Sequence, residues 1–229
     1  MIRASGRRGV PSAEPKTKRP GRPEGGTGQM RVDILDAAET IFSNQGYAGT
    51  TLREISDRAG VTQGLISYYF KSKFELFSET FLRRAEVIST QRIERLKALQ
   101  EGGQSPSVAA IVEAFLAPIL ALRTSAQGRS YLRLHARLHT EPPNLSYDLR
   151  KNAYDVSTNL YAEALHAALP HLSRSDIYWR MTLMIGTYLY ALSDTHRMDE
   201  LMAGSYDPED ADKLMAETVA FITSGLSRS

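Results

Sequence analysis

The sequence of 229 residues contains no cysteine and no run of alternating polar and apolar residues that would predict a β-strand. The absence of cysteine excludes disulfides, thiolate metal sites and cysteine nucleophiles. The longest apolar region, residues 108–122, is interrupted by Glu113 and is too short to span a bilayer. No apolar segment follows the basic N-terminus, so no secretory signal is visible and we expect a cytoplasmic protein with no membrane partner.

The common catalytic motifs are also missing. The sequence has no G-x-S-x-G, no P-loop, no G-x-G-x-x-G and no H-E-x-x-H. His135 and His139 have a spacing that can share a metal ion, but arginines at 133 and 137 flank them and would repel a cation. We therefore expect no enzyme activity, no cofactor and no metal site. A catalytic triad assembled only by the fold is an alternative that the motifs leave open.

Positive charge is concentrated at the N-terminus. Residues 1–31 hold eight Lys or Arg and two acidic residues, a net charge of +6, so the remainder carries −4 in a chain of net charge +2. Residues 1–29 are rich in Pro, Gly and Arg and should form a disordered basic arm. Its run KRPGRP, residues 18–23, is close to an AT-hook core, in which Arg22 would contact a narrow A·T minor groove. A solubilising tail is the alternative.

The most informative stretch is TLREISDRAGVTQGLISYYFKSKFEL, residues 51–76. Thr51 and Glu54 form a capping box that starts one short helix. Thr62 is a suitable N-cap for a second helix, and Gly60 between them suits a tight turn. This layout is typical of a helix-turn-helix, whose second helix enters the DNA major groove.

The second helix of this pair, about residues 62–69, has two distinct faces. Ile66 and Phe70 are four residues apart and should pack on the first helix. The opposite face is small, polar and aromatic, which suits a DNA groove better than a protein core. Ser72 and Glu75 form another capping box, so the next helix should begin there, with Lys73 near a phosphate. The residues predicted to contact DNA are Thr51, Arg53, Thr62, Gln63, Gly64, Leu65, Ser67, Tyr68, Tyr69 and Lys73, together with Arg22 of the arm.

Residues 30–77 resemble the DNA-binding domain of the TetR family of bacterial repressors. The matching positions in GVTQGLISYYFKSKFEL are Gly60, Val61, Gly64, Tyr69, Phe70, Lys73 and Leu76. Ser67 departs from the pattern, since many members carry Tyr there. The resemblance implies an all-α protein in which residues 30–77 bind DNA and residues 78–229 form a larger helical domain for ligand binding and dimerisation. It also implies a repressor that binds a palindromic operator as a homodimer and is released by a small-molecule effector.

The C-terminal region is rich in aromatic residues. A largely apolar ligand cavity is predicted there, lined by Phe115, Tyr131, His135, Tyr154 and Trp179. Arg129, Arg133 and Arg137 are further candidates to bind an acidic group on the ligand. Ordinary core or dimer packing of these aromatic residues is the alternative.

Two further alternatives concern the whole protein. The helix expected from about residue 173 to 198 contains a segment, residues 181–192, that is apolar nearly all round and must be buried on more than one side, either within a monomer or in a dimer. The resemblance favours the dimer, because the family pairs its last two long helices across a two-fold axis. The rival function is an architectural protein that coats DNA through its basic arm and senses no ligand, with a steep salt dependence and no operator preference.

Overall fold

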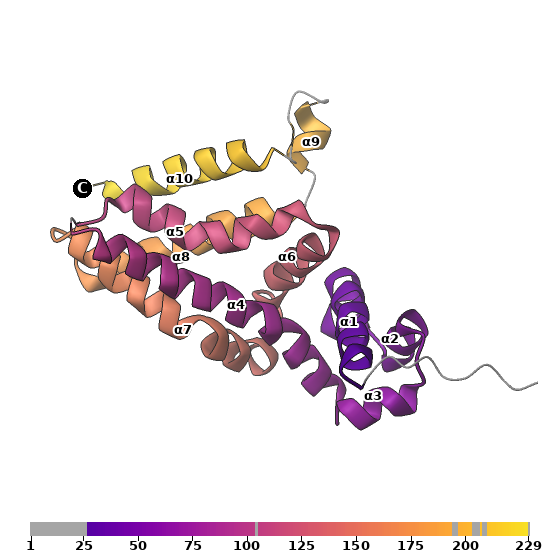
Figure 1. Cartoon of the computed structure of the whole chain (residues 1–229). Helices are drawn as coiled ribbons and strands as arrows, with labels where there is room; N and C mark the ends of the chain where they lie inside the picture. The colour runs from indigo at the N-terminus through magenta and orange to yellow at the C-terminus, as the bar shows by residue number, and fades with distance from the viewer. Residues whose placement is uncertain (1–26, 104, 194–196, 203–206, 208–209, 229) are drawn as a thin grey trace, which may run out of the picture.

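The computed structural model describes residues 27–103, 105–193, 197–202, 207 and 210–228. These residues form helices joined by short turns, and no strand occurs among them. The prediction of an all-α fold is confirmed. Figure 1 shows a small group of helices beside a larger helical body. The small group comprises α1 (Thr27–Gly49), α2 (Leu52–Ala59) and α3 (Gln63–Tyr69).

The larger body is organised around the long helix that leaves the small group. It comprises α4 (Lys73–Glu101), α5 (Val108–Leu120), the 3-10 turn η1 (Ala121–Thr124), α6 (Ala126–Leu138), α7 (Pro143–Ala168), α8 (Arg174–Leu192), α9 (Arg197–Met202) and α10 (Ala211–Ser227). Helix α4 packs against α5 and α7, while α10 packs on α5 and α8 (Figure 1). In the small group, α2 packs on α1, and α3 packs on α2.

Two helix starts differ from the sequence-based expectation. Ser72 caps α4 as predicted, but the second half of the capping box is not formed, because Glu75 accepts a hydrogen bond from the backbone N–H of Lys71 instead. Ser105, followed by Pro106, is the cap that the sequence suggests for the next helix, but α5 is capped by Ser107, whose hydroxyl oxygen accepts from the N–H of Ala110. The side chain nearest to a free backbone N–H decides the cap, and sequence spacing alone does not determine it.

The basic arm can be compared with the structure over three residues. Helix α1 begins at Thr27, so its first turn includes residues 27–29 of the expected arm. The rest of the arm, including the KRPGRP run and Arg22, lies outside the described residues.

Near its C-terminal end, α1 is fixed to α6. Gly46 adopts a left-handed φ of 74° and bends the helix. A Cβ atom at this position would lie 3.3 Å from Glu141 Oε1, so a larger residue would crowd the contact as well as strain the backbone. The backbone N–H of Tyr47 donates to Glu141 Oε1 at 3.1 Å, and Arg137 Nη2 donates to the carbonyl of Asn44 at 3.0 Å.

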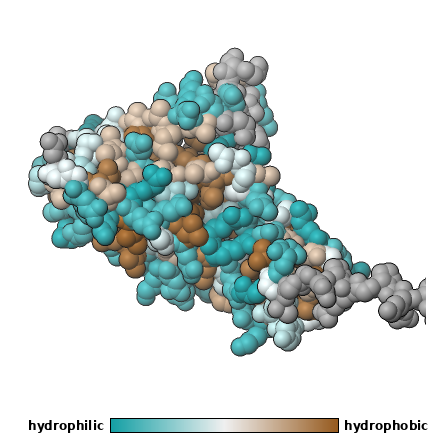
Figure 2. Space-filling view, in the orientation of Figure 1, coloured by the Kyte–Doolittle hydropathy of each residue, from teal (hydrophilic) through white to brown (hydrophobic). Residues whose placement is uncertain are grey.

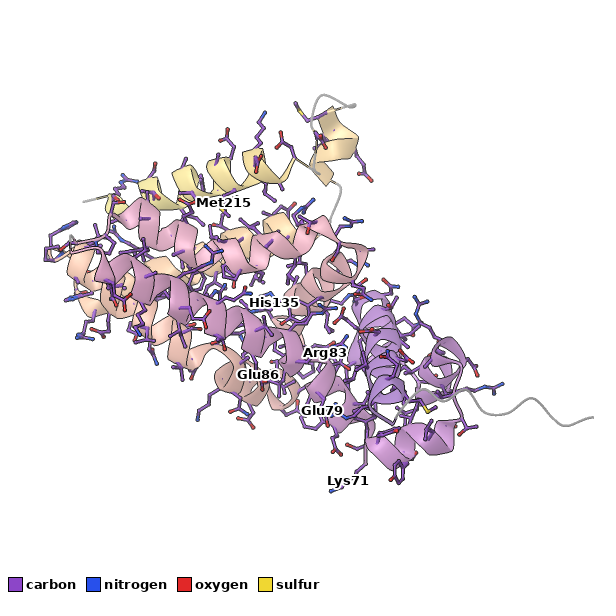
Figure 3. All side chains as sticks on the ribbon, viewed as in Figure 1. Lys71, Glu79, Arg83, Glu86, His135 and Met215 are labelled. Atoms are coloured by element: carbon purple, nitrogen blue, oxygen red, sulfur yellow. The ribbon has the colours of Figure 1, made fainter. Side chains whose placement is uncertain are left out.

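A buried carboxylate fixes α1 to α4. Glu39 on α1 is only 2% exposed and accepts hydrogen bonds from Arg84 Nε at 2.6 Å and from Arg83 Nη2 at 2.9 Å. Arg83 also reaches Asp36 Oδ1 at 2.8 Å, and Figure 3 shows this arginine where α4 passes α1. A carboxylate removed from water in this way is stable only while its cationic partners remain in place.

Figure 2 shows hydrophilic residues over most of the visible surface, with hydrophobic patches on the larger body. None of the helices in the described part of the chain combines the length and the apolar character that crossing a bilayer requires.

We predict that Glu39→Ala destabilises the protein by about 3 kcal/mol, because it leaves two partly buried guanidinium groups without their shared partner. Asp36→Ala removes a more exposed carboxylate from the same cluster and should cost less than about 1 kcal/mol. Urea denaturation followed by circular dichroism measures both changes. Equal losses in the two variants would show that the burial of Glu39 has no special weight.

Candidate functional site

Helices α2 and α3 form a helix-turn-helix with the caps that the sequence predicts. Thr51 Oγ1 accepts from the N–H of Glu54 at 3.2 Å, and the carboxylate of Glu54 accepts from the N–H of Thr51 at 2.9 Å. Gly60 ends α2 in the left-handed conformation, with φ of 66°. Thr62 Oγ1 accepts from the N–H of Leu65 at 3.3 Å and starts α3. These contacts fix the angle at which α3 leaves α2.

Helix α3 separates its buried face from its exposed face. Ile66 and Phe70 are 0% and 1% exposed and belong to the core of the small group. Tyr68 is 78% exposed, and Gln63 and Gly64 are exposed on the same side. The exposed face is therefore the one that the sequence assigns to DNA.

The other predicted contact residues of α2 and α3 differ in their surroundings. Arg53 is exposed and lies 3.9 Å from a carboxylate one turn later. The hydroxyl of Ser67 donates to the backbone carbonyl of Gln63 at 3.2 Å, so it is directed along its own helix. Leu65 and Tyr69 are half-buried. Their packing against neighbouring residues leaves less of their surface for a partner than Tyr68 has.

Lys73 lies at the start of α4, next to α1. Its Nζ donates to the backbone carbonyl of Ala48 at 3.5 Å and lies 4.6 Å from the ring centroid of Tyr47. Both contacts are within the chain. If the ammonium group of Lys73 also bound a DNA phosphate, it would do so while it contacts α1.

Gly64 has no packing role within the chain. A Cβ atom at this position would have only Thr62 Oγ1 nearby, at 3.9 Å. The backbone of α3 is therefore open to close approach from outside, which is what a helix lying in a DNA groove requires.

In the larger body, four of the five residues predicted to line a ligand cavity lie together. Phe115, Tyr131, His135 and Tyr154 are all buried. Trp179 is the exception, because it lies on α8 with 69% of its surface exposed. The structure thus places Trp179 outside the interior site.

These four residues belong to a larger set, which we call the Arg92 cluster. Its members come from α4 to α8 and are Phe81, Arg92, Phe115, Tyr131, His135, Tyr154, Tyr161 and Tyr188. The ring of His135 lies 5.4 Å from that of Tyr154 and 6.0 Å from those of Phe81 and Tyr131, measured between centroids. Figure 3 shows His135 where α6 meets α4.

Arg92 is the charged member of the cluster and was not among the residues predicted to line the cavity. It is 1% exposed, and its Nε donates to the backbone carbonyl of Phe115 at 2.9 Å. The guanidinium carbon lies 3.6 Å from the ring centroid of the same phenylalanine. Its Nη2 is buried and has no hydrogen-bond partner among the described residues. The signal in the sequence was an arginine at a buried position of an otherwise apolar stripe, formed by Phe81, Ala85, Ile88, Arg92 and Leu96.

The neighbours of Arg92 are uncharged. Burial, reinforced by His139 and Arg92, lowers the pKa of His135 far below its usual value, so the imidazole is neutral. Burial also raises the pKa values of Tyr131 and Tyr154, whose hydroxyl groups lie 3.0 Å apart. The guanidinium is therefore the charge of this cluster.

The three arginines that sequence analysis selected for an acidic ligand make other contacts. Arg129 Nη1 donates to the carbonyl of Arg123 at 2.9 Å, and Arg133 Nη2 donates to Ser130 Oγ at 3.2 Å. Arg137 is exposed and bonds to α1, as described above. No group of three or more His, Asp or Glu residues that could hold a metal ion lies within the described ranges.

The fold and the exposed face of α3 define a helix-turn-helix protein with a larger helical companion domain. Two family models match the chain. One, described as "Bacterial regulatory proteins, tetR family", matches residues 34–80, and the other, "Tetracyclin repressor-like, C-terminal domain", matches residues 113–225. The chain belongs to the TetR family of transcriptional regulators. The resemblance read from residues 30–77 is confirmed.

Individual relatives match over different lengths. The HTH-type transcriptional regulator AcrR of Shigella flexneri is 51% identical over 51 residues, which are 22% of this chain and 24% of AcrR. The negative transcriptional regulator of the biofilm operon, IcaR of Staphylococcus epidermidis, is 23% identical over 167 residues, covering 72% of this chain and 84% of IcaR. The chain thus spans about a quarter of the length of the first relative.

Solved structures share the fold at low identity. The transcriptional regulator FadR of Bacillus subtilis, solved in complex with stearoyl-CoA, has a TM-score of 0.54 and 20% identity, covering 85% of this chain and 98% of that one. FadR of Bacillus halodurans has a TM-score of 0.57 and 16% identity, covering 90% and 96%. These likenesses show that the fold extends over both domains.

We predict that Gly64→Ala separates folding from DNA binding. The new methyl group meets no crowded neighbour, and alanine favours a helix, so the free energy of unfolding should stay the same or rise by up to about 1 kcal/mol. DNA affinity should fall, because the methyl group holds the α3 backbone away from the groove. Urea denaturation and a gel-shift titration measure the two effects. Unchanged DNA affinity in a folded variant would show that no partner approaches α3 at this point.

The histidines of α6 should make stability depend on pH. Burial, with a contribution from Arg150, lowers the pKa of His139 to about 4. Between pH 6.5 and 4 the unfolded chain therefore binds more protons at this residue, so its stabilising contribution is present above pH 6.5 and is lost as the pH falls towards 4.

We predict that His139→Gln removes about 2 kcal/mol of this acid-induced destabilisation. Urea denaturation at pH 7 and pH 4.5 measures the loss of stability in the variant and in the wild type. His171→Gln, which changes an exposed histidine, is the matched control and should lose as much as the wild type. The same loss in both variants would contradict a buried neutral His139.

Proposed function

We propose that this protein is a ligand-responsive repressor that binds a palindromic operator through α3 and is released by a small, largely apolar effector. The observation that carries the proposal is the exposed, polar and aromatic face of α3 in a family-matched helix-turn-helix. Glutamine at position 63 can bond an adenine edge through two hydrogen bonds. The basic arm would add contacts in the adjacent minor groove. Binding to DNA makes the cytoplasm its place of action.

A homodimer is part of this proposal. Trp179 and Leu183 on α8 and Phe221 on α10 are 69%, 68% and 70% exposed, so both helices present apolar side chains outward. The groove between these helices, of about 500 Å³, is lined in part by Leu183 and Phe221. Exposed apolar faces of this kind favour association, and a two-fold dimer presents two recognition helices to two half-sites.

The contacts between the two domains support regulation by an interior ligand. On α4, Phe81 contacts the rings of Tyr131 and His135 in the Arg92 cluster. Arg83 and Arg84, which follow Phe81 by two and three residues, bind Glu39 of α1. On α6, His135 belongs to the cluster, and Arg137 bonds to α1. A ligand that displaces α4 or α6 would therefore change the placement of α1, and with it α3.

Relatives support the repressor and the apolar effector. IcaR is described as a negative transcriptional regulator, and FadR of Bacillus subtilis was solved with stearoyl-CoA. The rival is an architectural protein without a ligand, which would bind all sequences with a similar dependence on salt. An operator-specific component that an apolar ligand abolishes distinguishes the regulator from this rival.

We predict that selection from a random DNA pool yields a palindromic sequence, and that Gln63→Ala or Tyr68→Ala lowers affinity for it by about 1–3 kcal/mol. Affinity for unrelated DNA should change little. Gel-shift titrations at two salt concentrations measure both affinities. Tyr147→Ala, an equally simple change of an exposed tyrosine on α7, is the control and should leave both unchanged. Selection of no sequence, or full operator affinity in both α3 variants, would contradict the proposal.

A further inference from the structure

We propose that the effector carries one carboxylate on an apolar body, and that Arg92 receives this carboxylate inside the larger domain. The inference rests on the proposed function, because it names the chemical class of the effector. It depends on the polar groups that the Arg92 cluster leaves without partners.

The first argument is that the cluster has more hydrogen-bond donors than acceptors. Arg92 Nη2 is buried and has no partner among the described residues. The hydroxyl groups of Tyr131 and Tyr154 bond to each other, and since one donates to the other, one proton remains for a further acceptor. Nε2 of His135 is also buried and has no partner in the described part of the chain, and it is a further donor in the tautomer that carries the proton on Nε2. A carboxylate, which only accepts hydrogen bonds when ionised, complements such a set.

The second argument concerns charge. Arg92 makes no ion pair within the described residues, and burial keeps the neighbouring imidazole and phenols uncharged. A buried cation is costly unless an anion pairs with it. One guanidinium balances one negative charge, so a monoanionic carboxylate fits, whereas a phosphate dianion would bring a second, unbalanced charge into the interior.

The third argument is geometric. The ring of Phe115 covers one face of the guanidinium, with 3.6 Å between the guanidinium carbon and the ring centroid. Nη2 lies at the edge of this planar group. A carboxylate bonds to a guanidinium in its plane, so it can reach Nη2 while the stacked phenylalanine stays in place.

A cleft opens between α4 and α5, one turn of α4 before Arg92. It has a volume of about 360 Å³ and is lined in part by Arg83, Arg84, Ile88, Gln91 and Pro118. Ile88 lies one turn before Arg92 on the same buried stripe of α4. Pro118 lacks an N–H, so α5 is missing a backbone hydrogen bond here and can bend more easily. The volume suits a small molecule with a short apolar chain or a single ring.

Hydrogen bonds join α4 to α7 at and near Arg92. Tyr161 on α7 donates to the backbone carbonyl of Arg92 at 2.9 Å, and Ser89 bonds to Ser157 at 3.0 Å. These bonds hold α4 and α7 together. Entry from the α5 side leaves these two bonds intact.

The test compares carboxylic acids with neutral analogues of the same shape. Octanoate, decanoate and 4-phenylbutyrate are titrated into the full-length protein, each beside its amide, with octyl phosphate as a dianionic probe. Thermal unfolding and isothermal titration calorimetry measure binding. Near-ultraviolet circular dichroism of the buried tyrosines reports occupancy, because Trp179 lies outside the cluster. We expect at least one acid to bind about 10- to 100-fold more tightly than its amide, as for a hydrogen bond to a charged group.

Arg92→Met tests the residue itself. Methionine fills much of the same volume without a charge, so the acid should lose its advantage over the amide. The ligand-free variant should melt at the same or a higher temperature than the wild type, because an unpaired buried charge is removed. An arginine kept only for structure would instead lower the melting temperature when replaced. Arg95→Met, an exposed arginine on the same helix, is the matched control and should retain the preference for the acid.

The proposal is wrong if every acid and its amide act alike on the wild type, if Arg92→Met keeps the preference, or if octyl phosphate binds more tightly than octanoate. The comparison on the wild type decides the matter even if Arg92→Met does not fold. Operator binding is measured on the same preparations without any acid. An acid preference without operator binding would overturn the proposed regulator and support the carboxylate site. Operator binding without an acid preference would overturn the carboxylate site and support the regulator.

Discussion

The arrangement of the two domains depends on one buried carboxylate. Glu39 lies between two arginines of α4 and is almost fully removed from water. Its charge therefore restricts α1 to placements in which both guanidinium groups can still reach it. Helix α2 packs on α1, and α3 packs on α2, so the orientation of the DNA-binding face follows from this ionic contact. Hydrophobic packing alone, which has no strong directionality, would tolerate sliding between α1 and α4.

Helix α4 joins this ionic contact to the interior of the larger domain. Phe81 stacks near His135, and the arginines that hold α1 follow within one turn. Side chains in a packed interior cannot move independently, because few empty spaces exist to absorb a displacement. A group inserted beside Arg92 must therefore move a ring or a helix. Because α4 and α6 both bond to α1, a movement of either helix would also shift its contacts with α1.

Features that depend on neighbouring residues in the sequence, such as helix caps, could be predicted. Features that depend on which helices pack together were harder to predict. The caps at Thr51 and Thr62 and the two faces of α3 depend on residues within one turn, and the structure confirms them. Trp179 was assigned to the cavity because it is aromatic, but the buried face of α8 is formed by other residues such as Ile177 and Met181, and residue type alone cannot tell an inner face from an outer one. Arg92 was overlooked because arginine usually lies at the surface, although its spacing from Ile88 placed it on the buried stripe.

The order in which the small helices pack has a consequence for how such regulators diversify. The side chains that would read DNA lie on the outer face of α3, two helices away from the contacts that join the domains. Substitutions on that face disturb neither the ionic contact at Glu39 nor the interior around Arg92. If the larger domain senses a ligand as proposed, one copy could acquire a new target sequence after gene duplication and still respond to the original ligand. The architecture is thus compatible with related regulators that keep one ligand specificity and differ in the DNA sequence they bind.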